Sequence, residues 1–274
     1  MSAYPHIKTR VFSEISPDPE SLPLMSLGTN VLGVIVSHIK DPSYYSLVMA
    51  TSRTWQQCVN PYVKGWLQEF IFGAKDWARF FGGVGKEPPL PSHIFNILMK
   101  PCLYWEGKKI EETHLLILIP KSVDGVSLTL NRIQELIQSP KGGGYATNYK
   151  RYSEYEKKDL GDLEIEDSYW VLLTEEVIPS SQQQPFEAQK ALLKETDRVP
   201  TTFEATLAAV VQYVEVGEKL CAESSPTYTR CQEKVNNKEW RVLVGSFGAK
   251  GIVINSHYDH VCTGDFGLRA LRAF

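Results

Sequence analysis

TTFEATLAAVVQYVEVGEKL, residues 201–220, predicts a long helix in the second half of the chain. Thr201 or Thr202 is suited to the N-cap position, and Glu204 stands in the first turn, as in a capping box. Two further helices are predicted earlier in the chain. Residues 185–195 form one, and residues 127–140 form the other, which ends at Pro140 because proline cannot continue a helix.

Strands alternate with these helices. THLLILIP, residues 113–120, is a short continuous apolar run of the kind that forms a buried central strand. SYWVLLTEEVIP, residues 168–179, predicts a second strand that runs into a turn. WRVLVGSF and GIVINS, within residues 240–256, predict a hairpin about a glycine-containing turn. The second half therefore has the pattern of an α+β domain, in which helices pack on a small sheet.

The chain of 274 residues is long enough for one or two domains with a proper core. GGVGKEPPLPSH, residues 82–93, holds three glycines and three prolines and predicts a linker. Four parts follow: a flexible leader over 1–21, a helical module over 22–81, the linker over 82–93, and a mixed α+β domain over 94–274. The aromatic side chains of Trp66, Phe70, Trp77, Phe80 and Phe81 are expected at the seam between module and domain.

Composition excludes several classes of function. The net charge of −3 gives no electrostatic reason to expect binding to nucleic acid or to anionic membranes. Residues 31–39, an apolar stretch, are far too few to span a bilayer. The first residues lack the apolar core of a secretory signal, although an export signal without a hydrophobic mark stays open. Five cysteines without a tight framework indicate reduced thiols and a cytoplasmic location.

The N-terminal module carries an unusual amount of apolar surface. Apolar residues recur at helical spacing over residues 31–39, and Asp41-Pro42 then ends the helix. Asp41 can cap a second helix, and Pro42 fits its first turn. A third helix is predicted from Thr51 or Ser52 onward.

This pattern resembles an F-box. Leu27 matches the leading leucine of that family, although Gly28 stands where proline is usual, and residues 49–55 match the closing Arg-x-Trp. Asp41-Pro42 matches the turn, with Lys40 as a one-residue insertion, and Tyr44 or Tyr45 replaces a leucine. The positions that match the first helix are Val31, Leu32, Ile35 and Ile39.

The resemblance implies a binding function. F-boxes are three-helix adaptors that dock on the Skp1 subunit of cullin-type ubiquitin ligases, and apolar anchors dominate such interfaces. In the alternative interpretation the same side chains pack against the domain that follows. The partner-binding residues implied by the resemblance are Leu27, Leu32, Ile35, Ile39, Tyr44 and Trp55.

The rest of the chain resembles uncharacterised F-box-like proteins of chlamydia-like intracellular bacteria, through residues 72–91, 105–120, 140–149, 168–179 and 227–235. The resemblance brings no activity with it. It implies a non-catalytic effector that is exported to the cytosol of a eukaryotic host. There, residues 94–274 bind an unknown target protein while the module binds Skp1.

Three chemical alternatives stand beside the adaptor. PKGGGYAT, residues 140–147, could cradle an anion, but its glycines more simply supply positive φ after a helix. HYDHVCTGD, residues 257–265, could supply zinc ligands together with Cys231 or Cys221, but it lacks a Cys-x-x-Cys knuckle and reads as a polar turn. We therefore expect no metal and no cofactor.

The third alternative is a cysteine-dependent hydrolase or ubiquitin-modifying enzyme in the C-terminal domain. Cys231 could pair with His114, His257 or His260, and Cys102 is a second choice of nucleophile. No local sequence feature marks either thiol as reactive. Residues 150–168 mix acidic, basic and tyrosine side chains and are expected to be a solvated loop or helix face.

Overall fold

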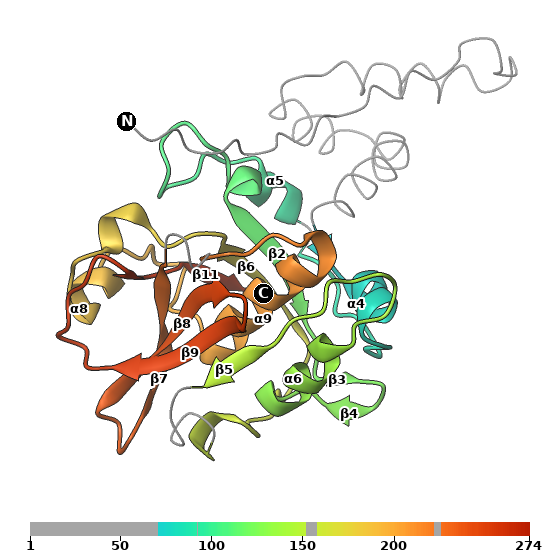
Figure 1. The fold of residues 1–274 in the computed structure, drawn as a ribbon. Coiled ribbons are helices and arrows are strands. Elements are labelled where there is room, and N and C mark those ends of the chain that lie inside the picture. Colours follow the sequence, from blue (N-terminus) through green and yellow to red (C-terminus); the bar gives the residue numbers. More distant parts are fainter. Residues whose placement is uncertain (1–70, 92, 152–157, 222–225) are drawn as a thin grey trace, which may run out of the picture. The chain divides into compact units, whose positions relative to one another are not determined.

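The computed structural model describes residues 71–91, 93–151, 158–221 and 226–274. These residues belong to the second of the two units into which the chain divides, Val63–Phe274. They form a four-stranded sheet, a five-stranded sheet, a two-stranded ribbon and several helices (Figure 1). The mixed α+β class predicted from the sequence is therefore confirmed for this part of the chain.

The first sheet has the strand order β1-β2-β6-β11. Its centre is the antiparallel pair β2 (His114–Ile119) and β6 (Tyr169–Thr174), the two apolar strands predicted from the sequence. β1 (Ile71–Phe72) lies parallel to β2, and β11 (Leu271–Ala273) lies antiparallel to β6. Nine of the 12 residues of these two strands are buried, as continuous apolar runs require, and His114, Leu115 and Tyr169 are partly exposed.

The second sheet has the strand order β10-β7-β8-β9-β5. β8 (Trp240–Gly248) and β9 (Gly251–His257) form the predicted hairpin, and β7 (Tyr228–Val235) pairs antiparallel with β8. β5 (Tyr149–Arg151) and β10 (Phe266–Gly267) lie parallel to β9 and β7 at opposite edges. This sheet is larger than the small sheet predicted from the sequence. The prediction lacked the short edge strands β5 and β10, because they come from distant parts of the chain.

Helix α9 (Thr202–Val216) lies between the two sheets (Figure 1). It contacts β2 of the first sheet and β7, β8 and β9 of the second. Eleven of its 15 residues are buried, including the small side chains of Ala205, Ala208 and Ala209. A helix that is covered on most sides must be apolar on most sides, and this explains why its sequence lacks a broad polar face.

The ends of α9 are defined by its caps. The Thr201 side chain accepts a hydrogen bond from the Glu204 amide, and the Glu204 carboxylate accepts one from the Thr201 amide at 2.7 Å. The predicted capping box is therefore confirmed, with Thr201 as the N-cap. Gly217 ends the helix in the left-handed conformation, with φ of 74°.

The remaining elements are shorter. α6 (Leu130–Gln138), the helix predicted before Pro140, contacts α9 and is capped by the Thr129 side chain. α8 (Phe186–Lys190) occupies only the first part of the helix predicted over 185–195. The others are α4 (Ala74–Phe80), α5 (Ile94–Leu98), the 3-10 helices η2 (Ile110–Glu112) and η3 (Pro179–Ser181), and the ribbon of β3 (Ser122–Val123) and β4 (Val126–Ser127).

Residues 71–81 differ from the helical structure predicted for the module over residues 22–81. They form β1 and α4, and the rings of Phe72, Trp77, Phe80 and Phe81 pack on one another in the core. The indole nitrogen of Trp77 donates a hydrogen bond to the Leu118 carbonyl of β2 at 3.0 Å. These aromatic residues thus belong to the α+β domain itself, and Trp66 and Phe70 lie outside the described residues.

The proline- and glycine-rich residues 82–91 also belong to this domain, whereas the sequence placed a linker here. Val84 is buried, and the Pro88 carbonyl accepts a hydrogen bond from the indole nitrogen of Trp170 on β6 at 2.9 Å. The Gly83 amide donates to the Asp124 carboxylate at 2.8 Å. The segment has neither helix nor strand, and the side chains before and after it share one hydrophobic core.

Glu204 joins the start of α9 to β6 and to the preceding loop. Its carboxylate, with an exposed fraction of 0%, accepts hydrogen bonds from the Arg198 guanidinium and, at 2.8 Å, from the Tyr169 hydroxyl. Burial alone would raise the pKa of Glu204. The hydrogen bonds and positive charge of Arg198, together with hydrogen bonds from Thr201 and Tyr169, instead hold this pKa below its ordinary value. The charged form therefore stabilises the folded state.

We expect Glu204→Gln to lower the free energy of unfolding at pH 7 by about 2 kcal/mol, less than for a fully buried pair because Arg198 is partly exposed. The lowered pKa of Glu204 means that this contribution is present above the unfolded-state pKa, about 4.5, and is lost as pH falls through the folded-state value. The difference in the free energy of unfolding between wild type and variant should therefore become smaller as pH falls below about 4.5. Urea unfolding at pH 7 and pH 3.5 measures both quantities.

Glu106→Gln is the matched control, since Glu106 is exposed, and it should change stability by less than about 0.5 kcal/mol. A difference between wild type and Glu204→Gln that stays constant from pH 7 to pH 3.5 would contradict the assignment of the stabilisation to the ionised carboxylate.

Candidate functional site

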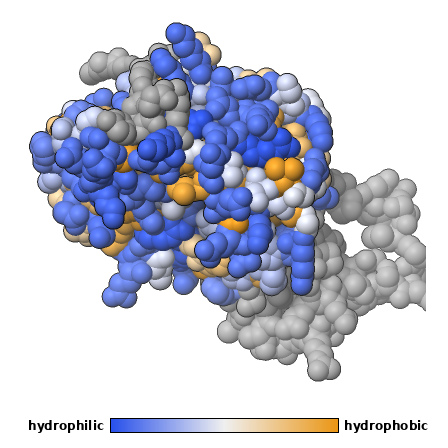
Figure 2. Space-filling model, turned by 90° about the horizontal axis from the view of Figure 1, so that it is seen from below, coloured by the Kyte–Doolittle hydropathy of each residue, from blue (hydrophilic) through white to orange (hydrophobic). Residues whose placement is uncertain are grey.

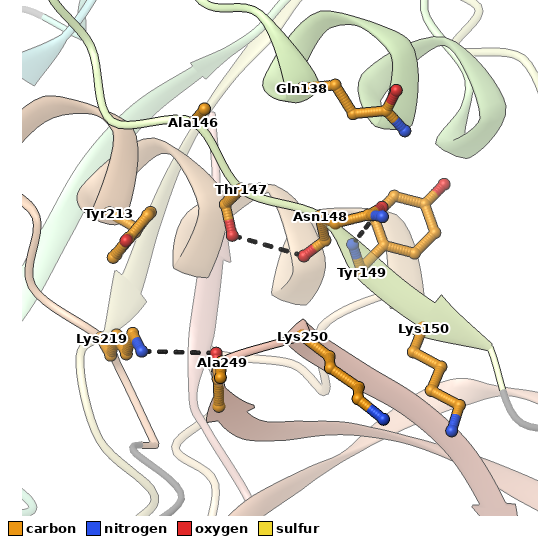
Figure 3. Close-up of a pocket in the computed structure, with 11 residues that line it drawn as sticks. Gln138, Ala146, Thr147, Asn148, Tyr149, Lys150, Tyr213, Lys219, Ala249 and Lys250 are labelled. Atoms are coloured by element: carbon orange, nitrogen blue, oxygen red, sulfur yellow. Dashed lines mark hydrogen bonds between the residues drawn. The ribbon is translucent and has the colours of Figure 1, made fainter.

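A cleft of about 600 Å³ opens where β5, the C-terminal end of α9 and the β8–β9 turn meet (Figure 3). Its walls come from four separate parts of the chain, so the tertiary fold assembles it. The residues that line it are Gln138, Ala146, Thr147, Asn148, Tyr149, Lys150, Tyr213, Lys219, Gly248, Ala249 and Lys250.

A close backbone approach sets one wall of this cleft. Gly251 begins β9 with φ of 91°, and a Cβ there would lie 1.7 Å from the Asn148 carbonyl oxygen, so only glycine fits. The Ile252 amide donates to that same carbonyl at 3.1 Å and starts the parallel pairing of β5 with β9. The Asn148 side-chain oxygen accepts from the Tyr149 amide and from Gln134, which fixes the amide group at the wall.

The electrostatic character of the cleft is basic. Three of its lining residues are lysines and none is acidic, in a chain whose net charge is −3. The Lys219 ammonium donates to the Gly248 carbonyl at 3.3 Å and lies 5.9 Å from the ring centres of Tyr213 and Phe247. Lys250 stands on the β8–β9 turn, and neither Lys219 nor Lys250 forms an ion pair with any described residue. A ligand with negative charge suits this arrangement.

An aromatic surface adjoins the lysines. Tyr213 of α9 lines the cleft, and its ring centre lies 4.9 Å from that of Phe247 and 6.0 Å from that of Tyr145. Tyr145 is 53% exposed. The cleft therefore offers an apolar contact as well as positive charge.

The glycine-rich residues 140–147 have a mainly conformational role. Gly142 and Gly143 have φ of 60° and 78°, which confirms the expectation that they supply positive φ after a helix. Ala146 and Thr147, at the end of this stretch, do line the cleft. Sequence reasoning missed Lys219 and Lys250 entirely, because single lysines in two separate segments carry no motif.

The predicted partner-binding residues lie outside the described residues. This holds for Leu27, Leu32, Ile35, Ile39, Tyr44 and Trp55 alike. Their role in docking on Skp1 therefore stays a prediction from the sequence.

The two thiols considered as nucleophiles from the sequence, Cys231 and Cys102, are both buried. Cys231 of β7 is fully buried, and burial raises the pKa of its thiol well above the ordinary value. Cys102 is buried as well. Burial lowers the pKa of His114 to about 4, and its Nδ1 contacts the Thr113 hydroxyl at 2.8 Å. None of the described cysteines hydrogen-bonds a histidine side chain.

His257 ends β9, and residues 258–265 form a polar loop after it, in agreement with the interpretation of most of this stretch as a turn. Asp259 in this loop pairs with Arg241 and with Lys234, each at 2.6 Å, so its carboxylate ties the loop to β8 and β7. Tyr258 stacks on His260 with ring centres 5.5 Å apart. Among the described residues, no three His, Cys, Asp or Glu side chains are grouped as ligands of a metal ion.

Two further observations bear on classification. None of the described helices is both long and apolar enough to serve as a membrane span. Neither a protein-family model, nor a curated protein, nor a solved structure matches this chain.

The thiol environments predict a labelling order. Iodoacetamide should label Cys262, which is exposed, and Cys221, which is partly exposed, at least about tenfold faster than Cys231 and Cys102 in the folded protein. Urea should abolish the difference. Peptide mass spectrometry of timed samples measures each rate, and Cys262→Ser identifies the fastest site. Labelling of Cys231 as fast as Cys262 would contradict its burial and would favour the cysteine-enzyme alternative.

Proposed function

We propose that this chain is a non-catalytic adaptor, in which the F-box-like residues 27–55 dock on Skp1 and the α+β domain binds a target protein. The observation that carries the proposal is the sequence pattern itself: a leading leucine, apolar positions at helical spacing, an Asp-Pro turn and a closing Arg-x-Trp. Such a short helical segment cannot bury all of its apolar residues internally, so a partner can cover them.

The described domain supports this division of labour in two ways. Its two sheets and α9 bury a core of their own from residues 71–274. In the view of Figure 2, hydrophobic side chains are scattered among hydrophilic ones, so this face has no broad apolar area. A polar surface suits a domain that binds its target reversibly and leaves the apolar docking to residues 27–55.

The surroundings of Cys231, Cys102 and Cys262 favour an adaptor over an enzyme that uses one of these three thiols as its nucleophile. A cysteine nucleophile needs a thiolate and a nearby base. Cys231, the first candidate for this role, is held as a neutral thiol by burial, and Cys102 is buried. The exposed Cys262 donates to the main-chain carbonyl of His260 and has no base as a side-chain partner among the described residues.

We expect the full chain to bind purified Skp1 with a Kd on the order of micromolar or tighter. Ile35→Asp with Trp55→Ala should weaken that binding at least about a hundredfold, because buried aliphatic and aromatic anchors carry most of the energy of such interfaces. Isothermal titration calorimetry measures both values. Circular dichroism shows whether the variant keeps its fold.

The matched control changes neighbouring polar positions in the same way. Ser37→Asp with Thr54→Ala should bind Skp1 as the wild type does, since Ser37 lies about half a turn away from Ile35 on the predicted helix. Absence of binding by the wild-type chain would refute the adaptor proposal. Equal loss in the control would show that the segment has no specific docking face.

A further inference from the structure

We propose that the lysine cleft binds an extended acidic segment of a partner protein. The assignment of this segment to the recruited target rests on the proposed function, but the binding itself does not require Skp1. Three features carry the inference: a lining that has three lysines and no acidic residue, polar groups placed for main-chain contacts, and an aromatic surface beside them.

Two lysines of the cleft differ from the arginines that hold the domain together. Arg198, Arg241 and Arg272 each form an ion pair with a carboxylate, and the buried Arg230 donates to the Gln189 side chain. These cations are used by the fold. In contrast, Lys219 and Lys250 face the same cleft without a carboxylate partner among the described residues. Mutual repulsion of such lysines is relieved by an anionic ligand.

The positions of the lysines favour a chain over a small anion. Lys150 is on β5, Lys219 follows α9, and Lys250 is on the β8–β9 turn, so the charges border the cleft from different elements (Figure 3). The lining has no arginine, whose guanidinium fork would favour a single phosphate or carboxylate group. An extended peptide advances about 3.3 Å per residue and can present successive carboxylates to separate lysines.

The remaining walls can bind the main chain and an apolar side chain. The Asn148 side-chain oxygen is occupied by Gln134 and by the Tyr149 amide, which leaves its NH2 group for a ligand carbonyl. Gln138 and Thr147 add polar groups across the opening. Tyr145 and Tyr213 offer an apolar surface at the edge, so an acidic segment that contains one aliphatic residue fits best.

Fluorescence anisotropy with a fluorescein-labelled Glu-Glu-Asp-Leu-Glu-Glu peptide tests the inference on the full chain. Lys219→Glu with Lys250→Glu should weaken binding about tenfold or more, and rising salt should weaken wild-type binding. Lys75→Glu with Lys121→Glu is the matched control, because both lysines are exposed, lie outside the cleft and give the same change of net charge. It should bind within about twofold of the wild type. Thermal melting confirms that both variants fold.

Several outcomes would overturn the inference. Equal weakening by the two variants would show that only net charge matters. If a Gln-Gln-Asn-Leu-Gln-Gln peptide bound as tightly as the acidic peptide, the lysines would have no role in recognising negative charge. Displacement of the acidic peptide by inorganic pyrophosphate at lower concentrations than by unlabelled peptide would assign the cleft to small anions. The measurement contains no Skp1, so its failure counts against the cleft alone, and loss of Skp1 binding counts against the adaptor.

Discussion

The burial of α9 between two sheets is the constraint on which the rest of this domain depends. A helix with eleven of its 15 residues buried has to be covered on more than one side, and one sheet covers only one side. The second sheet is therefore a requirement of the helix sequence. It brings β5 and the β8–β9 turn together near the end of α9, and this creates the cleft. The cleft therefore results from the way in which the second sheet packs on α9.

Several charged groups inside the domain have structural partners. Glu204 holds Arg198 and Tyr169 at the start of α9, and Arg241 and Asp259 tie the loop after β9 to the sheet. Unpartnered buried charge would be costly, so these contacts are explained by stability alone. Lys219 and Lys250 are exposed and form no ion pair with described residues, and together with Lys150 they line one cleft that has no acidic side chain, which makes them candidates for recognition.

Sequence reasoning recovered the elements whose patterns are local. β2, β6, α6, α9 and the β8–β9 hairpin each have a continuous apolar run, a cap or a glycine turn within a few residues. β1, β5, β10 and β11 have two or three residues each and exist only through pairing with distant strands, so no local pattern announces them. β7 has no local apolar pattern, because Arg230 and Lys234 interrupt it. Arg230 can nevertheless be buried, since it donates hydrogen bonds to the Gln184 carbonyl and the Gln189 side chain, which only the tertiary fold brings near it. The cleft could not be predicted either, because its lining residues come from separate parts of the chain. The F-box-like pattern, in contrast, lies within a short stretch of sequence and can be recognised there.

The position of α9 in the chain has a consequence for biosynthesis. β2 and β6 are made before the helix, but β7 to β11 are made after it, and Leu271 of β11 is completely buried against β6. While the ribosome still holds these last strands, one side of α9 has nothing to pack on. The nascent domain therefore cannot reach its final state before residues 271–273 emerge, and until then its apolar helix surface is available to chaperones.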